Sequence, residues 1–270
     1  MSVAMHSKVD DAFLDHALNV AREAAAAAAK VIAGYYRDQH LAVEFKSDQS
    51  PVTQADVESE QVIRAHLTGA FPDHAIFGEE QGRQGDSDFL WLVDPIDGTK
   101  SFVRGYPMFS TQIALMVCGE LVLGVSSASE YGDLAYARRG GGAFLNGKPV
   151  QVARLAQLEQ ATISTGNLKS LAAGPGWAAL AGLIQRCNRI RGYGDFFHYH
   201  LLASGALDVV IESDLNILDV AALAVIVREA GGVFTDLDGA ELDLDTRSVL
   251  AATPALHAEV LNSLRGWRGT

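Results

Sequence analysis

Cysteine is almost absent from the 270-residue sequence, which has only Cys118 and Cys187. Two isolated thiols cannot build a disulfide framework or a thiolate zinc site. Long apolar runs are also missing, since Ala24–Ala29 and Val220–Val227 are far shorter than the roughly 20 residues of a membrane-spanning helix. Residues 1–11 contain no basic segment followed by an apolar one, so no secretory signal is expected. These absences predict a soluble, cytoplasmic protein.

Positive charge is in short supply as well. The chain has 21 Lys and Arg against 33 Asp and Glu, a formal net charge of −12. Neither nucleic acid nor an anionic membrane is therefore an expected partner, because both favour basic surfaces. The eight histidines show no metal-ligand spacing. His198 and His200 lie two apart, which places them on different sides of a helix and favours a structural role.

The hydrophobic patterns predict a layered α/β (α+β) architecture. Apolar residues at three- and four-residue spacing predict helices over Asp10–Arg37 and Thr53–Leu67, joined by a polar loop at Lys46–Val52. The apolar run Phe89–Val93 predicts a strand that ends at Asp94-Pro95. Further strands are expected at 111–117, 121–126, 134–137, 142–145, 207–211, 232–235 and 248–252, and further helices near 99–103, 177–187, 195–204 and 219–230. A change of character near residue 150 predicts two subdomains, residues 1–150 and 151–270.

The densest chemical signal is the motif Asp94-Pro-Ile-Asp-Gly-Thr99. Pro95 fixes φ, Gly98 lets the backbone approach a ligand closely, and Thr99 begins a predicted short helix whose free N–H groups suit an anion. Two carboxylates beside a phosphate would repel it and each other, unless Mg²⁺ is also bound. The alternative is a simple turn, because Asp and Gly dominate turns.

Three other segments add carboxylates to this motif. Gly78-Glu-Glu80 follows a predicted strand, and Asp219 interrupts the apolar run Ile217–Val227, where an unpaired charge would be costly. Thr53-Gln-Ala-Asp56 lies at a predicted helix start, where Asp56 alone is also explained as a first-turn acid favoured by the helix dipole. The four segments together favour a metal site over an isolated turn.

At these residues the chain resembles the inositol monophosphatase-like family of Mg²⁺-dependent, lithium-sensitive phosphatases. The first family signature is similar to Trp91-Leu-Val-Asp-Pro-Ile-Asp-Gly-Thr-Lys-Ser-Phe102, and the second to Leu218-Asp-Val-Ala-Ala222 followed by Glu229-Ala-Gly-Gly232. The Gly78–Glu80 and Thr53–Asp56 elements match in type and order, and the resemblance runs from about Phe13 to Leu264. The second signature usually carries Trp where this chain has Leu218, which affects local packing more than ligation.

The resemblance implies alternating αβαβα layers, a homodimer and specific roles for the motif residues. The implied ligands of two or three Mg²⁺ ions are Glu79, Asp94, the Ile96 carbonyl, Asp97 and Asp219. Glu79 and Thr99 would orient the attacking water, and the amides of Gly98 and Thr99 would hold the phosphate. Asp56 would bind metal-bound water or a weak third ion.

The resemblance leaves the phosphate ester open among inositol monophosphate, histidinol phosphate, 3′-phosphoadenosine compounds and fructose bisphosphate. Glu212, seven residues before Asp219, matches a family position that contacts the leaving group. Asp195 occupies a position where inositol phosphatases usually have a small hydroxyl residue. Together with Asp219, these acids would line the substrate side. They suit the ammonium and imidazole of histidinol through charge-assisted hydrogen bonds, whereas neutral inositol gains little. The alternative is that Asp195 caps the helix that follows it.

Gly194-Asp-Phe196, with Asp97-Gly-Thr-Lys-Ser-Phe102, is similar to the histidinol-phosphate phosphatases of this superfamily. The predicted activity is therefore Mg²⁺-dependent hydrolysis of L-histidinol phosphate, a step of histidine biosynthesis. Inositol-1-monophosphatase activity is the alternative, and a catalytically silent binding protein is the alternative from another class. A haloacid-dehalogenase mechanism is disfavoured, because Asp94 and Asp97 are separated by two residues rather than one.

Overall fold

Two β-sheets form the frame of the computed structural model, which describes residues 9–37, 43–45, 51–174 and 176–264. The large sheet has the order β10-β9-β8-β7-β6-β5-β3-β4 and the small sheet the order β12-β11-β13-β15-β14. The strands of the large sheet are β3 (Ala75–Gly78), β4 (Gly82–Gln84), β5 (Phe89–Asp97), β6 (Ser110–Val117), β7 (Glu120–Ala128), β8 (Asp133–Arg138), β9 (Gly142–Leu145) and β10 (Lys148–Val150). Those of the small sheet are β11 (Thr162–Thr165), β12 (Arg189–Arg191), β13 (Val209–Ser213), β14 (Val233–Thr235) and β15 (Ser248–Ala252). A separate antiparallel pair consists of β1 (Val43–Phe45) and β2 (Pro51–Thr53).

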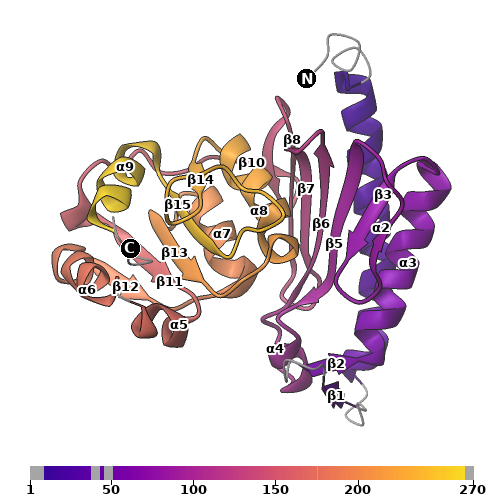
Figure 1. The fold of residues 1–270 in the computed structure, drawn as a ribbon, viewed down its shortest axis with the longest axis horizontal. Helices are drawn as coiled ribbons and strands as arrows, with labels where there is room; N and C mark the ends of the chain where they lie inside the picture. The colour runs from indigo at the N-terminus through magenta and orange to yellow at the C-terminus, as the bar shows by residue number, and fades with distance from the viewer. Residues whose placement is uncertain (1–8, 38–42, 46–50, 175, 265–270) are drawn as a thin grey trace.

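Helices and sheets alternate in five layers, as the family resemblance implies (Figure 1). The helices are α2 (Asp11–Arg37), α3 (Gln54–Ala70), α4 (Thr99–Val103), α5 (Leu168–Ala173), α6 (Trp177–Arg186), α7 (Asp195–Ala203), α8 (Ile217–Glu229) and α9 (Pro254–Ser263), with a 3₁₀ turn at Leu158–Gln160. The pair α2 and α3 covers one face of the large sheet, α7 and α8 lie between the sheets, and α5, α6 and α9 cover the small sheet. The predicted αβαβα architecture is confirmed.

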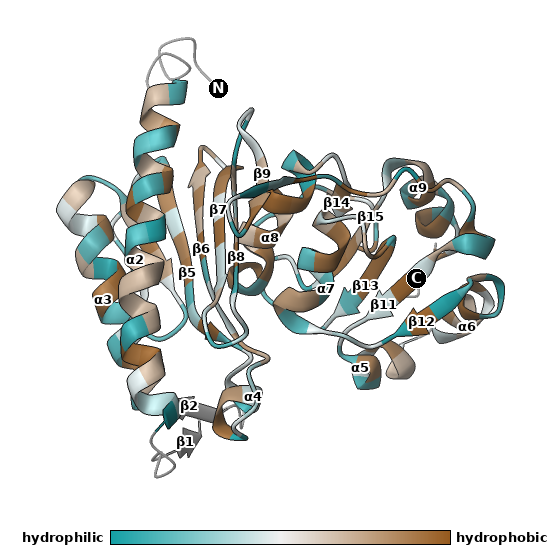
Figure 2. Cartoon of the chain, turned by 180° about the vertical axis from the view of Figure 1, so that it is seen from behind, coloured by the Kyte–Doolittle hydropathy of each residue, from teal (hydrophilic) through white to brown (hydrophobic). Residues whose placement is uncertain are grey.

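The outer helix α2 shows how the sequence builds these layers. Ala17, Ala21, Ala24 and Ala28 are fully buried on one face, while polar residues occupy the outward face (Figure 2). Small side chains let the helix approach the sheet closely, which agrees with the predicted periodicity of this segment. No helix within the described ranges has both the length and the apolarity to cross a membrane.

The central helix α8 is the element that carries chemistry into the middle of the fold. It packs against β7 through Gly124, where an added Cβ would lie 2.3 Å from the Ala222 carbonyl oxygen. The glycine therefore allows helix and sheet to approach closely, and this packing holds the first turn of α8, with Asp219, beside the end of β5.

Most predicted elements are present in the structure. The hairpin of β6 and β7 and the turn at Asn146-Gly147, where both residues have positive φ, are confirmed. The predicted loop at Lys46–Val52 lies outside the described residues except for its last two, which belong to β2. The large sheet comes from residues 75–150 and the small one from residues 162–252, while two subdomains as folding units stay a prediction.

Candidate metal-binding active site

The strand β5 delivers two aspartates to one place through an irregularity in its pairing. The sequence pattern predicts that the strand ends at Asp94-Pro95. This prediction is wrong, because β5 continues to Asp97. Asp94 pairs with Gln112 and Asp97 with Ser110, so three steps along β5 oppose two along β6. Such a bulge accommodates proline, which has no N–H for the ladder. Residues three apart in a regular strand face opposite sides, whereas the extra residue lets both carboxylates face the same space.

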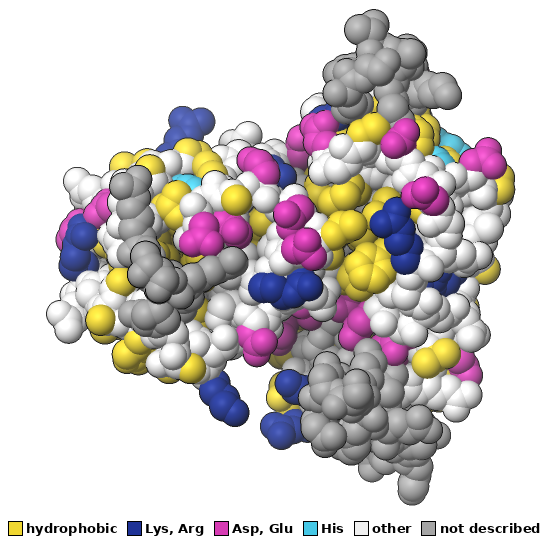
Figure 3. Space-filling view, in the orientation of Figure 1, with side chains coloured by type: hydrophobic (Ala, Val, Ile, Leu, Met, Phe, Trp, Pro, Cys, Tyr) yellow, Lys and Arg dark blue, Asp and Glu magenta, His cyan; other side chains and the backbone are white. Residues whose placement is uncertain are grey.

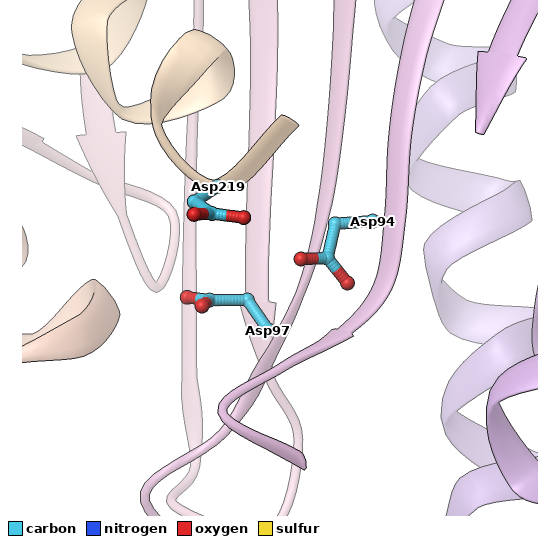
Figure 4. Close-up of side chains that lie close together, drawn as sticks. All are labelled: Asp94, Asp97 and Asp219. Atoms are coloured by element: carbon cyan, nitrogen blue, oxygen red, sulfur yellow. The ribbon is translucent and has the colours of Figure 1, made fainter. Parts of the chain in front are cut away.

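Asp219 completes this cluster from the first turn of α8. Carboxylate oxygens of Asp94, Asp97 and Asp219 all lie within 4.8 Å of one another, and Figure 4 shows the three groups converging on a common space. Asp219 accepts hydrogen bonds from the Asn216 backbone N–H (2.9 Å) and side-chain amide (2.8 Å). Asn216 caps the helix in return, which forms a capping box that fixes the direction of the carboxylate. The charge in the apolar run is therefore hydrogen-bonded rather than isolated.

The electrostatics of the cluster are compatible with a bound cation. Burial and the charges of Glu79, Asp97 and Asp219 hold the pKa of Asp94 well above its usual range. Burial raises the pKa of Asp219 to about 7, to which neighbouring Glu79 also contributes. So many carboxylates stay ionised together only when a positive charge compensates them. An all-oxygen donor set of this kind suits a hard divalent cation such as Mg²⁺.

Glu79 lies at the end of β3, next to β5. Its backbone N–H donates to the Val93 carbonyl at 3.1 Å, which continues the parallel pairing of the two strands by one residue. Its side chain shares a hydrogen bond with Asp94. The predicted ligand Glu79 is thus in contact with the aspartate cluster.

Asp56 and Thr99 form a polar link beside the cluster. Asp56 is fully buried, and one of its carboxylate oxygens accepts from the Thr53 N–H (2.7 Å) and hydroxyl (2.6 Å). The Thr99 hydroxyl lies 3.3 Å from the other carboxylate oxygen and 3.0 Å from the Ile96 carbonyl oxygen. Thr53 and Asp56 form a capping box at the start of α3, so Asp56 is held by its own helix start and points to α4.

Gly98 has a reason within the fold for being glycine. Its φ is +92°, and an added Cβ would lie 2.7 Å from the Met108 carbonyl oxygen. Close approach of another backbone segment therefore requires a glycine here, whereas an approach of a ligand to Gly98 stays a prediction. The predicted short helix α4 begins directly after it, at Thr99.

A second acidic pair lies on the side of the cluster nearer the small sheet. Asp195, Glu212, Asp97 and Asp219 line one cavity of about 50 Å³ together with Asn167 and Tyr199, and with the apolar Leu215, Val220 and Leu223. Glu212 is buried and sits against Gly166, where any Cβ would collide with its carboxylate. Burial and the neighbouring charge of Glu212 raise the pKa of Asp195 to about 6. The predicted substrate acids therefore line the same cavity as Asp97 and Asp219 of the aspartate cluster.

The structure corrects the alternative role of Asp195 as a helix cap. The N-cap of α7 is Gly194, and Asp195 is the first helical residue. Its φ of +47° is a left-handed conformation that non-glycine residues rarely adopt. Strained backbone of this kind tends to occur at functional sites, where the surrounding structure holds it in place.

Glu212 is oriented by two residues of α7. The Tyr199 hydroxyl donates to its Oε2 at 2.7 Å, and His198 Nε2 lies 3.1 Å from the same oxygen. His200, two residues on, contacts Ser126 on the large sheet at 2.9 Å. The two histidines do lie on different sides of the helix, but His198 reaches a residue of the site.

Comparison with known proteins agrees with this geometry. The family model described as the inositol monophosphatase family matches residues 14–266. The chain belongs to the inositol monophosphatase family. It is 35% identical to a histidinol-phosphatase of Chlorobaculum parvum (92% of this chain, 96% of that protein) and 39% identical to a histidinol-phosphatase of Mycobacterium tuberculosis (83% and 88%).

Solved structures show the same fold. The crystal structure of the extragenic suppressor protein SuhB from Bartonella henselae is similar to it with a TM-score of 0.83 at 32% identity, over 93% of this chain and 98% of that one. Other relatives carry the name inositol-1-monophosphatase. The family and the names of these relatives show that the chain is a phosphatase that hydrolyses phosphomonoesters. The inositol monophosphatase family is metal-dependent.

Supporting residues in this inositol monophosphatase fold carry weaker sequence signals than the acids they hold. His198 and Tyr199 lie on α7, and Asn167 lines the cavity. Glu60 lies on α3, one helical turn after Asp56, and both are fully buried. An acid four residues after a motif acid is the sequence signal that could have identified Glu60, because such residues share a helix face.

Proposed function

We propose that this phosphatase hydrolyses L-histidinol phosphate with the help of Mg²⁺. The observation that carries the proposal is the cavity in which Asp195 and Glu212 adjoin the metal-site residues Asp97 and Asp219. The negative charge of this cavity supports the proposal, because it would compensate a cationic leaving group. As part of the same proposal, the enzyme acts in the cytoplasm, as a homodimer, in histidine biosynthesis.

The Mg²⁺ ligands in this proposal are carboxylates, together with one carbonyl. They are Glu79, Asp94, Ile96 through its carbonyl, Asp97 and Asp219, holding two or three ions. Bound Mg²⁺ would supply positive charge that neutralises the phosphate oxygens and increases the acidity of water. The close approach of Asp94, Asp97 and Asp219, with Glu79 beside Asp94, supports this set, because such carboxylates repel one another without a cation.

The protein's own groups would orient the reactants. Glu79 and Thr99 would align the attacking water, and the amides of Gly98 and Thr99 would hold the phosphate. Asp56 accepts a hydrogen bond from the Thr99 hydroxyl, so it would keep that hydroxyl aligned with its oxygen available to water. Positioning of this kind is a major source of rate enhancement in phosphoryl transfer.

The leaving group decides between the candidate esters. Histidinol carries an ammonium and an imidazole, and both pair favourably with carboxylates through charge-assisted hydrogen bonds. Inositol has only neutral hydroxyls, which do not compensate the negative charges of the two carboxylates. Inositol 1-phosphate is the second candidate, and the inositol-1-monophosphatases among the relatives favour it.

A substrate panel tests the proposal. The purified enzyme is assayed with Mg²⁺ on L-histidinol phosphate, inositol 1-phosphate and adenosine 3′,5′-bisphosphate, and released phosphate is measured. We expect the highest kcat/KM for L-histidinol phosphate and none of this activity after chelation. A preference for inositol 1-phosphate refutes the substrate assignment, and turnover that survives thorough chelation refutes the metal requirement.

A further inference from the structure

A buried ion pair on α3 holds the loop that carries Glu79. Glu60 is fully buried and Arg64 is 7% exposed, and their side chains meet at 2.7 Å between Arg64 Nε and Glu60 Oε1. Neither residue belongs to the acidic cluster or to the cavity. A buried charged pair is costly to maintain unless its remaining hydrogen-bonding groups are satisfied, and here the loop satisfies them.

The backbone that follows Glu79 supplies those hydrogen bonds. The Glu80 N–H donates to Glu60 Oε2 at 2.7 Å, and the Gln81 N–H donates to Glu60 Oε1 at 3.1 Å. Arg64 extends the contact by donating to the Gly82 carbonyl at 2.6 Å. One carboxylate therefore binds two successive amides of the connection between β3 and β4.

The glycine of the Gly78-Glu-Glu80 motif is explained by the same contact. A Cβ at Gly78 would lie 2.3 Å from Glu60 Oε1 and 2.8 Å from an Arg64 nitrogen. The absence of a side chain lets the buried pair approach the backbone on the side preceding Glu79. With the N–H of Glu79 itself bound to Val93, the main chain around Glu79 is fixed on both sides.

We propose that Glu60, paired with Arg64, is a positioning residue that aims the Glu79 carboxylate at the metal cluster. It touches neither substrate nor metal, and it acts through the peptide groups that follow Glu79. Hydrogen-bonding partners behind a metal ligand commonly change metal affinity by about 10–100-fold when they are removed. The inference rests on the proposed function in so far as Glu79 is a metal ligand.

Metal binding to the metal-free protein is the direct test, because it requires no substrate. Mg²⁺ is titrated calorimetrically into the stripped wild type and into Glu60→Gln, which keeps the size of the side chain but loses its charge. We expect the Mg²⁺ affinity of Glu60→Gln to fall by at least about tenfold. Hydrogen exchange at the Glu80 and Gln81 amides should accelerate in the same variant.

Glu229→Gln is the matched control. Glu229 also lies on a helix and accepts from two backbone amides of a turn, those of Gly140 and Gly142, both at 2.9 Å. It lies at the far end of α8 from Asp219, so its loss should lower the melting temperature without changing Mg²⁺ affinity. A comparable loss of affinity in both variants, or none in Glu60→Gln, overturns the inference.

A milder variant covers the case in which Glu60→Gln does not fold. Arg64→Lys keeps a positive charge beside Glu60 but loses the planar group that reaches Gly82. It should weaken Mg²⁺ binding by about threefold to tenfold, and an unchanged affinity counts against the inference. If the wild type itself binds no Mg²⁺, the metal part of the proposed function fails instead.

Discussion

Replacing Asp195 by Asn isolates the contribution of one charge to substrate choice. The side chains are nearly equal in size, so the cavity keeps its shape while it loses one of the two acids on the leaving-group side. A hydrogen bond to a charged group contributes about 1.5–3 kcal/mol. Its loss therefore predicts a fall of about 10–100-fold in kcat/KM for L-histidinol phosphate, at about 1.4 kcal/mol for each factor of ten.

Inositol 1-phosphate serves as the internal control for Asp195→Asn, because a neutral leaving group gains no charge-assisted bond from this position. Its kcat/KM should change by less than about threefold, well below the charge-assisted contribution. The melting temperature should stay close to that of the wild type, since Gly194 rather than Asp195 is the N-cap of α7. An equal loss on both esters would refute the reasoning, as would a large drop in melting temperature.

Three further variants test other parts of the structure. Asp94→Asn removes a charge from the metal cluster and should lower kcat by several orders of magnitude in the Mg²⁺-dependent assay, while circular dichroism still shows a folded protein. Thr99→Ala removes the hydroxyl whose single proton lies within hydrogen-bonding distance of Asp56 and of the Ile96 carbonyl, and should reduce kcat by about 10²-fold. A change confined to KM would assign Thr99 to ground-state binding instead. Burial lowers the pKa of His74 to about 4, so the unfolded chain binds a proton first as pH falls. The contribution of His74 to the free energy of unfolding is complete above about pH 6.5 and is lost towards pH 4. It amounts to about 1–2 kcal/mol once the partial exposure of the side chain is allowed for. In His74→Phe, the free energy of unfolding measured with urea should fall less over this pH range than it does in the wild type. Parallel pH profiles of the two proteins would contradict the prediction.

The sequence predicts the outer layers and the acidic motifs well, because both rest on local patterns. The periodicity of α2 reflects burial of one helix face, whereas the apolar runs of β6 and β7 reflect burial on both faces of the sheet. The end of β5 is wrongly predicted, since proline normally terminates pairing. A bulge between Asp94 and Asp97 absorbs the proline, and a bulge depends on the neighbouring strand, which local sequence does not reveal.

The small sheet and the support of the site depend on distant partners. Strand β12 has only three residues, two of them arginines, and it owes its pairing to β11 rather than to an apolar pattern of its own. Glu60 likewise follows an ordinary polar helix pattern, and only the approach of the Gly78–Glu80 loop explains its complete burial. Interactions between segments far apart in sequence override local propensity at both places.

Two of the site's acids are fixed by the same local device. Asp56 and Asp219 each occupy the third position of a helix, and each accepts the backbone N–H of its own N-cap residue, Thr53 or Asn216. A capping box stabilises a helix start whether or not a cation is present. The directions of these two carboxylates are therefore set by folding, before any cation binds. Glu79 comes from a loop and has no helix start to hold it. The pair of Glu60 and Arg64 holds the backbone that follows Glu79 instead.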